Sequence, residues 1–158
     1  MPLMEALRHR ESHREFSPEP LDEQNLSDLL WAAAGINRPK LGRAHHAERD
    51  ECSGGATLCG FATGAVPLRT GGVHELQLAV ASDVRRATGD QDFFDNAALD
   101  LIYVADHTQM KLVPAAQREA YAFAAAGAMA QNVYLCCASA GSRRSSVPGS
   151  TAMRWRRR

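Results

Sequence analysis

Two segments near the amino terminus carry hydrophobic residues at helical spacing. In the first, Leu3, Met4 and Leu7 precede the charged stretch RHRESHRE, a pattern typical of a short amphipathic helix with a polar end. In the second, an apolar stripe lies between a plausible N-cap, Asp22, and a good stop signal, Gly35. The stripe consists of Leu26, Leu29, Leu30 and Ala33. We therefore expect two helices before the loop INRPKLGR.

Two later segments have the hydrophobic pattern of strands. HELQLAVA, residues 74–81, alternates apolar residues with polar or small neighbours. LDLIYVAD, residues 99–106, is more continuously apolar and is flanked by polar residues, as a buried strand would be. Between the helices and the second strand, residues 44–73 show neither a helical nor a strand period. The pattern thus predicts a chain that mixes α and β structure.

The longest apolar segment runs from about Arg118 to Gly141 and reads REAYAFAAAGAMAQNVYLCCASAG. Its length raises the question of a membrane span. Gln131 and Asn132 lie in its middle, and two adjacent amides would be costly in lipid. The many small residues instead favour a buried helix packed closely against a neighbour or a second subunit, and we expect no membrane segment.

Length and charge limit the function classes. A chain of 158 residues with 45% hydrophobic residues suits one domain. The formal net charge is zero, but six of the 18 basic residues are arginines after Gly141, so the preceding part is mildly acidic. Such a body does not favour a polyanionic partner. An alternative function is that of a small protein whose basic tail binds nucleic acid or another anionic partner.

The cysteines indicate a reducing compartment. Four cysteines are too few to form the disulfide framework of a chain of this size, and MPLMEALRHRES has no secretory pattern, so we expect a cytoplasmic protein. Cys136 and Cys137 are adjacent in an apolar segment and are interpreted as small core residues. The remaining potential metal ligands have a spacing that fits no standard zinc motif, so no metal is expected. They are His45, His46, Cys52 and Cys59.

One short motif carries candidate chemistry. Within RHRESHREFS, Arg10 and Arg14 are four residues apart and are expected on one helix face, with Ser12 between them. Two guanidinium groups and a hydroxyl near a helix end suit a phosphate, because planar donors match phosphate oxygens and keep their charge. On spacing alone, a charged surface helix with Glu11 and Glu15 as incidental partners is the simpler interpretation.

Several ordered blocks resemble the nitroreductase family, the homodimeric FMN-dependent oxidoreductases. RHRESHREFSPEPLDEQNLSDLLWAAAGINRP is similar to the RxSxRxF and LSxLLWAAxGxNRP helices of that family. ASDVRRATGDQDFFDNAALDLIYVAD and AAAGAMAQNVYLCCASAG are similar to its middle part, including a GxxAQNxYL core helix. The resemblance covers residues 1–43 and 74–141. It implies an α+β fold with a central, mostly antiparallel sheet and a long buried helix at a dimer interface, incomplete here at the C-terminus.

The resemblance also implies a cofactor and a site. FMN would lie between two subunits, and hydride from NAD(P)H would reach a nitroaromatic, a quinone or a similar small-molecule acceptor through the flavin, with no catalytic acid or base required. The chain looks closest to the branch that resembles peptide-azoline dehydrogenases. The positions that match family contacts to the flavin phosphate and ribityl chain are Arg10, Glu11, Ser12 and Arg14, and those that match the turn near the isoalloxazine ring are Ala140 and Gly141.

Two stretches depart from the family pattern. The family has a PSAxN loop where this chain reads AHHAERDEC, and GLATVVRG where it reads GSRRSSVPG. With GC-rich codons, a neighbouring frame can read RTTPSAMNV over residues 44–52, RYRYEPV at AVPLRTGG and LASVVRAGLDRDALAAA from Gly141. We therefore infer a nitroreductase-like domain over residues 1–141, with residues 44–73 and the basic tail 142–158 translated out of frame. We expect both stretches to be poorly ordered or poorly packed, and activity to be reduced or lost.

Overall fold

The computed structural model describes residues 1–12, 21–38, 43–44, 55–61, 64–68, 97–108, 110–141 and 156–157. Side-chain burial is described for 1–12, 21–35, 97–108 and 110–141. The predicted strand at residues 74–81 lies outside the described residues, as does Arg14.

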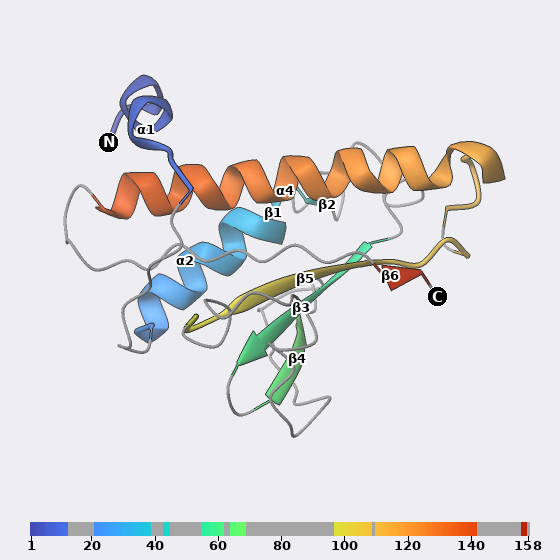
Figure 1. Ribbon diagram of the computed structural model, residues 1–158, viewed down its shortest axis with the longest axis horizontal. Helices are drawn as coiled ribbons and strands as arrows, with labels where there is room; N and C mark the ends of the chain where they lie inside the picture. Colours follow the sequence, from blue (N-terminus) through green and yellow to red (C-terminus); the bar gives the residue numbers. More distant parts are fainter. Residues whose placement is uncertain are drawn as a thin grey trace.

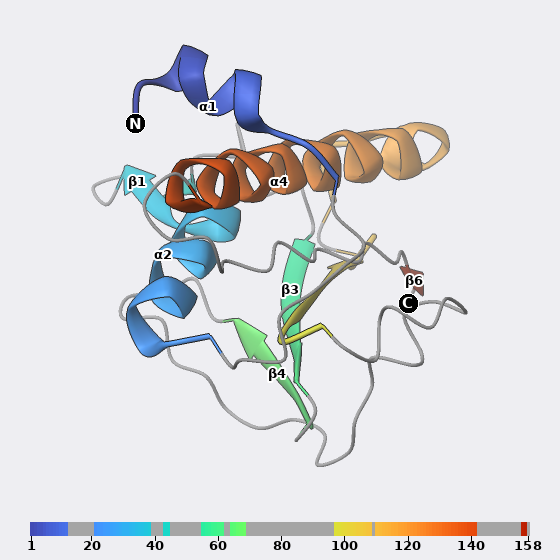
Figure 2. The same ribbon diagram turned by 60° about the vertical axis from the view of Figure 1, so that its left-hand side comes forward.

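The described helices are arranged around one long helix. This helix, α4 (Arg118–Gly141), has the bounds that the sequence predicted and follows a short 3-10 turn, Ala115–Gln117. Helices α1 (Leu3–His9) and α2 (Glu23–Ala34) both contact α4. Figures 1 and 2 show α1 and α2 on different sides of the C-terminal half of α4. None of the helices in the described part of the chain is long and apolar enough to cross a membrane.

A four-stranded sheet lies beside these helices, in the order β4-β3-β5-β6. Its strands are β3 (Gly55–Phe61), β4 (Gly64–Leu68), β5 (Asp100–Ala105) and β6 (Arg156–Arg157). The pairs β3–β4 and β3–β5 are antiparallel, whereas β5–β6 is parallel. A separate antiparallel pair joins β1 (Ile36–Arg38) to β2 (Arg43–Ala44). Strand β5 confirms the apolar strand predicted at 99–106.

Residues 44–73, for which we expected poor order or poor packing, include the two segments that form β3 and β4. Residues 55–60 of β3 pair one by one with residues 105–100 of β5, and Thr57–Phe61 pair with Leu68–Gly64 of β4. Pairing of this kind satisfies backbone donors and acceptors and does not require alternating side chains. A glycine-rich segment without strand periodicity can therefore form a strand. In the basic tail, β6 likewise pairs with Val104 and Ala105 of β5.

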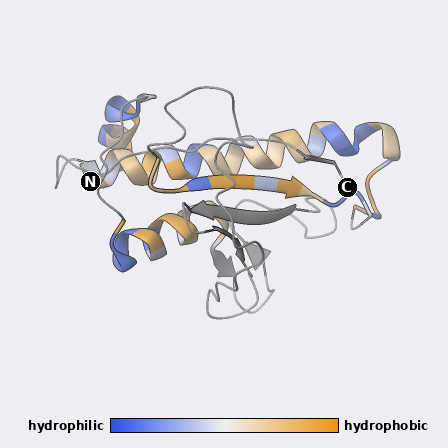
Figure 3. Ribbon diagram, turned by 60° about the horizontal axis from the view of Figure 1, so that its bottom comes forward, coloured by the Kyte–Doolittle hydropathy of each residue, from blue (hydrophilic) through white to orange (hydrophobic). Residues whose placement is uncertain are grey.

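The core forms where α2 and α4 pack on β5. On α4 the buried residues recur at helical spacing, and small side chains among them allow the helix to approach the strand closely. Figure 3 shows the hydrophobic residues of β5 next to α4. The cluster comprises Leu29, Leu30, Ala33 and Ala34 of α2, Leu99, Leu101 and Tyr103 at β5, and Ala126, Met129 and Val133 of α4. Complete burial of a leucine or valine stabilises a fold by about 1.5–3 kcal/mol, so this cluster is the main source of stability described.

Helix α2 begins and ends where the sequence predicted, but the glycine at its C-terminus has a different role from the one expected. The Asn25 N–H donates to Asp22 Oδ1 at 2.7 Å, which confirms the N-cap. Gly35 has extended backbone angles, φ −66° and ψ 151°, and its N–H donates to the Trp31 carbonyl at 2.7 Å. A Cβ on Gly35 would lie 2.5 Å from that same oxygen. Glycine is needed here for a close approach, not for a left-handed conformation.

Helix α1 exposes residues that its amphipathic pattern placed inward. Leu3 and Met4 are 62% and 63% exposed, and Leu7 is also exposed, whereas Ala6 is buried. The apolar stripe of α1 therefore does not pack on the core of a single chain. Its small residue, Ala6, is buried and lines a cavity shared with α4, together with Leu3.

We predict that Gly35→Ala destabilises the fold by about 1–3 kcal/mol, because the added methyl group would overlap the Trp31 carbonyl oxygen and force a shift of the chain. Gly127→Ala is the matched control: a Cβ there would meet nothing within 4 Å, and alanine favours a helix interior by up to about 1 kcal/mol. Urea unfolding followed by circular dichroism measures both. Equal stability of G35A and the parent chain would contradict the close approach.

Candidate functional site

The extended segment after α1 meets α4 through one aromatic contact. The guanidinium carbon Cζ of Arg10 lies over the ring of Tyr134, 5.8 Å from its centroid. This distance is within the range of a cation–π interaction. Arg10 is partly buried, whereas the following Glu11 and Ser12 are exposed. Arg10 is therefore held on α4 while its neighbours face solvent.

The prediction that Arg10 and Arg14 share one helix face is wrong. Helix α1 ends at His9, and Arg10 is extended, with φ −67° and ψ 116°. His9 Nδ1 lies 2.8 Å from the Glu5 carbonyl oxygen, a contact that satisfies one of the last carbonyls of α1 when Nδ1 carries the proton. Helical spacing therefore does not apply to Arg10, Glu11 and Ser12, and Arg14 lies outside the described residues.

Ala140 and Gly141 are the last two residues of α4. Ala140 is partly buried and Gly141 is exposed, and a Cβ on Gly141 would meet nothing within 4 Å. Ala140 is six residues beyond Tyr134, which corresponds to about 9 Å along a helix axis. The structure thus brings Arg10 to the same half of α4 as Ala140 and Gly141.

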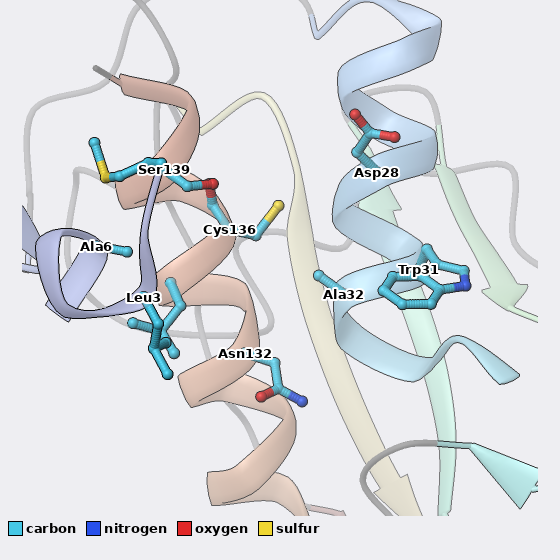
Figure 4. Close-up of a pocket in the computed structure, with 10 residues that line it drawn as sticks. Leu3, Ala6, Asp28, Trp31, Ala32, Asn132, Cys136 and Ser139 are labelled. Atoms are coloured by element: carbon cyan, nitrogen blue, oxygen red, sulfur yellow. The ribbon is translucent and has the colours of Figure 1, made fainter. Parts of the chain in front are cut away.

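A cavity of about 590 Å³ lies between α1, α2 and α4. Figure 4 shows Asp28 and Trp31 of α2 on one side of it, opposite Asn132 and Cys136 of α4. The sequence pattern marks neither Asp28 nor Trp31 as a lining residue of a cavity. A signal was present in α4, where the lining residues recur three and four positions apart. The lining consists of Met1, Leu3, Ala6, Asp28, Trp31, Ala32, Asn132, Leu135, Cys136 and Ser139.

The cavity and the Arg10 contact use different sides of α4. Tyr134 is two residues from both Asn132 and Cys136, which corresponds to a rotation of about 200° around the helix axis. Helix α1 contributes Leu3 and Ala6 to the cavity, and the chain then carries Arg10 to the ring of Tyr134. The N-terminal segment therefore contacts α4 at two places.

Burial favours the protonated form of the two adjacent thiols, Cys136 and Cys137. Burial, and next the charge of the Asp28 carboxylate, raise the pKa of Cys136. Burial, and next the neighbouring Cys136, raise the pKa of Cys137 to about 12, although a backbone hydrogen bond opposes the shift. Both residues pack against the core cluster, which confirms them as small core residues. A thiol that stays protonated is a poor nucleophile and a poor metal ligand.

The donors that the structure describes at this end of α4 fit a phosphate-bearing ligand. Arg10 supplies a partly desolvated guanidinium, and Ser12 an exposed hydroxyl. Within the described residues, no group of three or more His, Cys, Asp or Glu side chains could hold a metal ion. The side chains of His45, His46, Cys52 and Cys59 lie outside that part of the chain.

Comparison with known proteins relates the chain to one family. A family model described as the nitroreductase family matches residues 65–143, from β4 to just beyond α4. Among solved structures, the chain is similar to a protein from Ralstonia eutropha JMP134 that was provisionally assigned as a nitroreductase. The two share 44% identical residues with a TM-score of 0.80, and the match covers 89% of this chain and 67% of that chain. A comparison with curated proteins gave no match.

We predict that Cys137 reacts at least about 100-fold more slowly with iodoacetamide in the folded chain than in the urea-unfolded chain at pH 8. The thiolate is the reactive form, and a pKa near 12 lowers its fraction by about three orders of magnitude relative to an unperturbed thiol near 9. Mass spectrometry of the peptide that carries the label measures each rate. Raising the pH toward 12 should speed the reaction, and equal folded and unfolded rates at pH 8 would contradict the shift.

Proposed function

The chain belongs to the nitroreductase family, and from this premise we propose that it is an FMN-dependent oxidoreductase. The electrons of NAD(P)H would pass to a nitroaromatic, a quinone or a similar small-molecule acceptor. Family membership supports an oxidoreductase, and the single observation that carries the choice of cofactor is the position of Arg10 at the C-terminal end of α4. When bound, the flavin would supply the redox chemistry, and the protein supplies binding and orientation.

The described residues have distinct proposed roles. Arg10 would bind the phosphate through its planar N–H donors, and Ser12 would donate a hydrogen bond nearby. Glu11 is exposed beside them and would lie next to the ribityl chain. At the other end of the flavin, Ala140 and Gly141 would offer backbone without a bulky side chain, so that the flat ring could approach closely. Arg14 is proposed as a second phosphate ligand by its place in the motif.

A homodimer is proposed from the outward face of α4. Tyr121 is 51% exposed, and Ala124 and Ala128, three and seven residues further along the same face of the helix, are exposed as well. Exposed aromatic and small residues along a long helix are typical of a surface that packs against another chain. Such a helix can approach a second copy closely, because its small residues leave room for the partner.

We predict that Ala128→Arg lowers the dimer fraction, since a long charged side chain would enter the proposed helix contact. Ala116→Arg is the matched control, because Ala116 is exposed in the 3-10 turn before α4 and is not part of that helix. Sedimentation velocity measures the masses. A parent chain that is a monomer, or an A128R chain that is as dimeric as A116R, would contradict the proposal.

Other features stay proposals of narrower scope. We place the chain near the branch that resembles peptide-azoline dehydrogenases, and in the cytoplasm, and sequence patterns alone support both.

We also propose that residues 44–73 and 142–158 are translated out of frame. The end of the family match at residue 143 supports this for the tail, while its start at residue 65 weighs against it for residues 65–73. Sequencing the coding DNA for nearby insertions or deletions tests it. The comparisons do not favour the alternative of a nucleic-acid-binding tail.

We predict that Arg10→Ala weakens FMN binding by about tenfold or more, because a charge-assisted contact to phosphate contributes about 1.5–3 kcal/mol. Arg8→Ala is the matched control: Arg8 is exposed on α1, two residues earlier. Fluorescence titration with FMN gives the dissociation constants, and riboflavin, which lacks the phosphate, should distinguish the variants little. Failure of the parent chain to bind FMN, or equal losses in R8A and R10A, would overturn the proposed function or the role of Arg10, respectively.

A further inference from the structure

The position of Arg10 depends on a side-chain contact more than on its backbone. It follows the last residue of α1 and has extended backbone angles, so the helix does not fix its direction. Glu11 and Ser12 after it are exposed, whereas Arg10 is partly buried against α4. The contact that the structure describes for it there is the ring of Tyr134, 5.8 Å from the guanidinium carbon.

Tyr134 lies on a well-packed part of α4. It directly follows Val133, which is completely buried in the core cluster, and it lies one turn beyond Ala130, which is 2% exposed. The ring therefore extends from a part of α4 that is packed on β5. The arginine side chain, which has many rotamers, thus contacts a ring attached to a well-packed part of α4. The sequence motif marked this tyrosine only as part of a core helix and did not indicate the contact.

We propose that Tyr134 is a positioning residue that holds the Arg10 guanidinium ready for a phosphate group of the ligand. The inference rests on the proposed function, since it takes that phosphate to belong to FMN. An aromatic ring attracts a guanidinium through the ring face, while the N–H donors at the edge of the guanidinium remain able to bind phosphate oxygens. Because arginine has many rotamers, a guanidinium that is already oriented loses less entropy when the phosphate binds.

The role requires the ring of Tyr134 and not its hydroxyl, so two substitutions separate it from simple packing. We expect Tyr134→Leu to raise the dissociation constant for FMN by about two- to fivefold, as the loss of a cation–π contact would. Tyr134→Phe should bind FMN like the parent chain. Riboflavin, which has no phosphate, should bind all three chains alike. A general packing defect would instead weaken both ligands.

A second readout needs no ligand. In NMR spectra of the flavin-free chain, the Hδ protons of Arg10 should be shifted upfield by the ring in the parent chain and in Y134F, and the shift should disappear in Y134L. The absence of an upfield shift in the parent chain would overturn the inference without any substitution, even if Y134L failed to fold.

The outcomes separate the two proposals. If the parent chain binds FMN but Y134L binds it equally well, the role of Tyr134 is overturned while the proposed function stands. If the parent chain does not bind FMN, the proposed function is overturned, and this inference with it. If the FMN affinity and the upfield shift of the Arg10 Hδ protons both depend on the ring of Tyr134, both proposals are supported.

Discussion

The close packing of α4 on β5 is the constraint on which the rest of the described structure depends. Buried side chains of α4, mostly alanine with Met129 and Val133, meet Leu101 and Tyr103 of the strand. Small side chains bring the helix close to the sheet, and the larger ones fill the space between them. The same strand anchors β3 and β6 through its backbone, so sheet and helices share one central element.

A helix held on one side can present its other sides to different partners. Around α4, one side faces the core, another lines the cavity with α1 and α2, and exposed residues such as Tyr121 and Ala128 lie away from the core. Arg10 reaches the helix through Tyr134, near the end that carries Ala140 and Gly141. The candidate site is thus assembled from segments that are far apart in the sequence, and the core packing of α4 sets their separation.

Local rules predicted the helices well. The N-cap Asp22, the start and end of α2, and both bounds of α4 follow from side-chain spacing and capping chemistry, which act over a few residues. The strands β3 and β4 could not be predicted in this way, because the pairing with β5 depends on a distant segment and not on local alternation. For Gly35 the residue was identified correctly, but its reason, the proximity of the Trp31 carbonyl, is visible only in three dimensions.

In the candidate site, too, some features follow from the local sequence and others depend on contacts between distant segments. The residue types of the RxSxR motif indicated phosphate chemistry, and Arg10 lies where that chemistry is plausible. The helical face assigned to Arg10 and Arg14 was wrong because α1 ends at His9. Tyr134, Asp28 and Trp31 had no distinctive local signal, since each gains its place from contacts between helices. Motif chemistry can thus be read along the chain, whereas the groups that support it cannot.

The central claim is that the N-terminal segment and the C-terminal end of α4 together form a flavin site. The most direct test is the visible absorbance spectrum of the purified chain after incubation with FMN and removal of free cofactor by gel filtration. The account predicts that a flavin spectrum stays with the protein and can be bleached by NADH or NADPH. A folded chain that retains no flavin would contradict it.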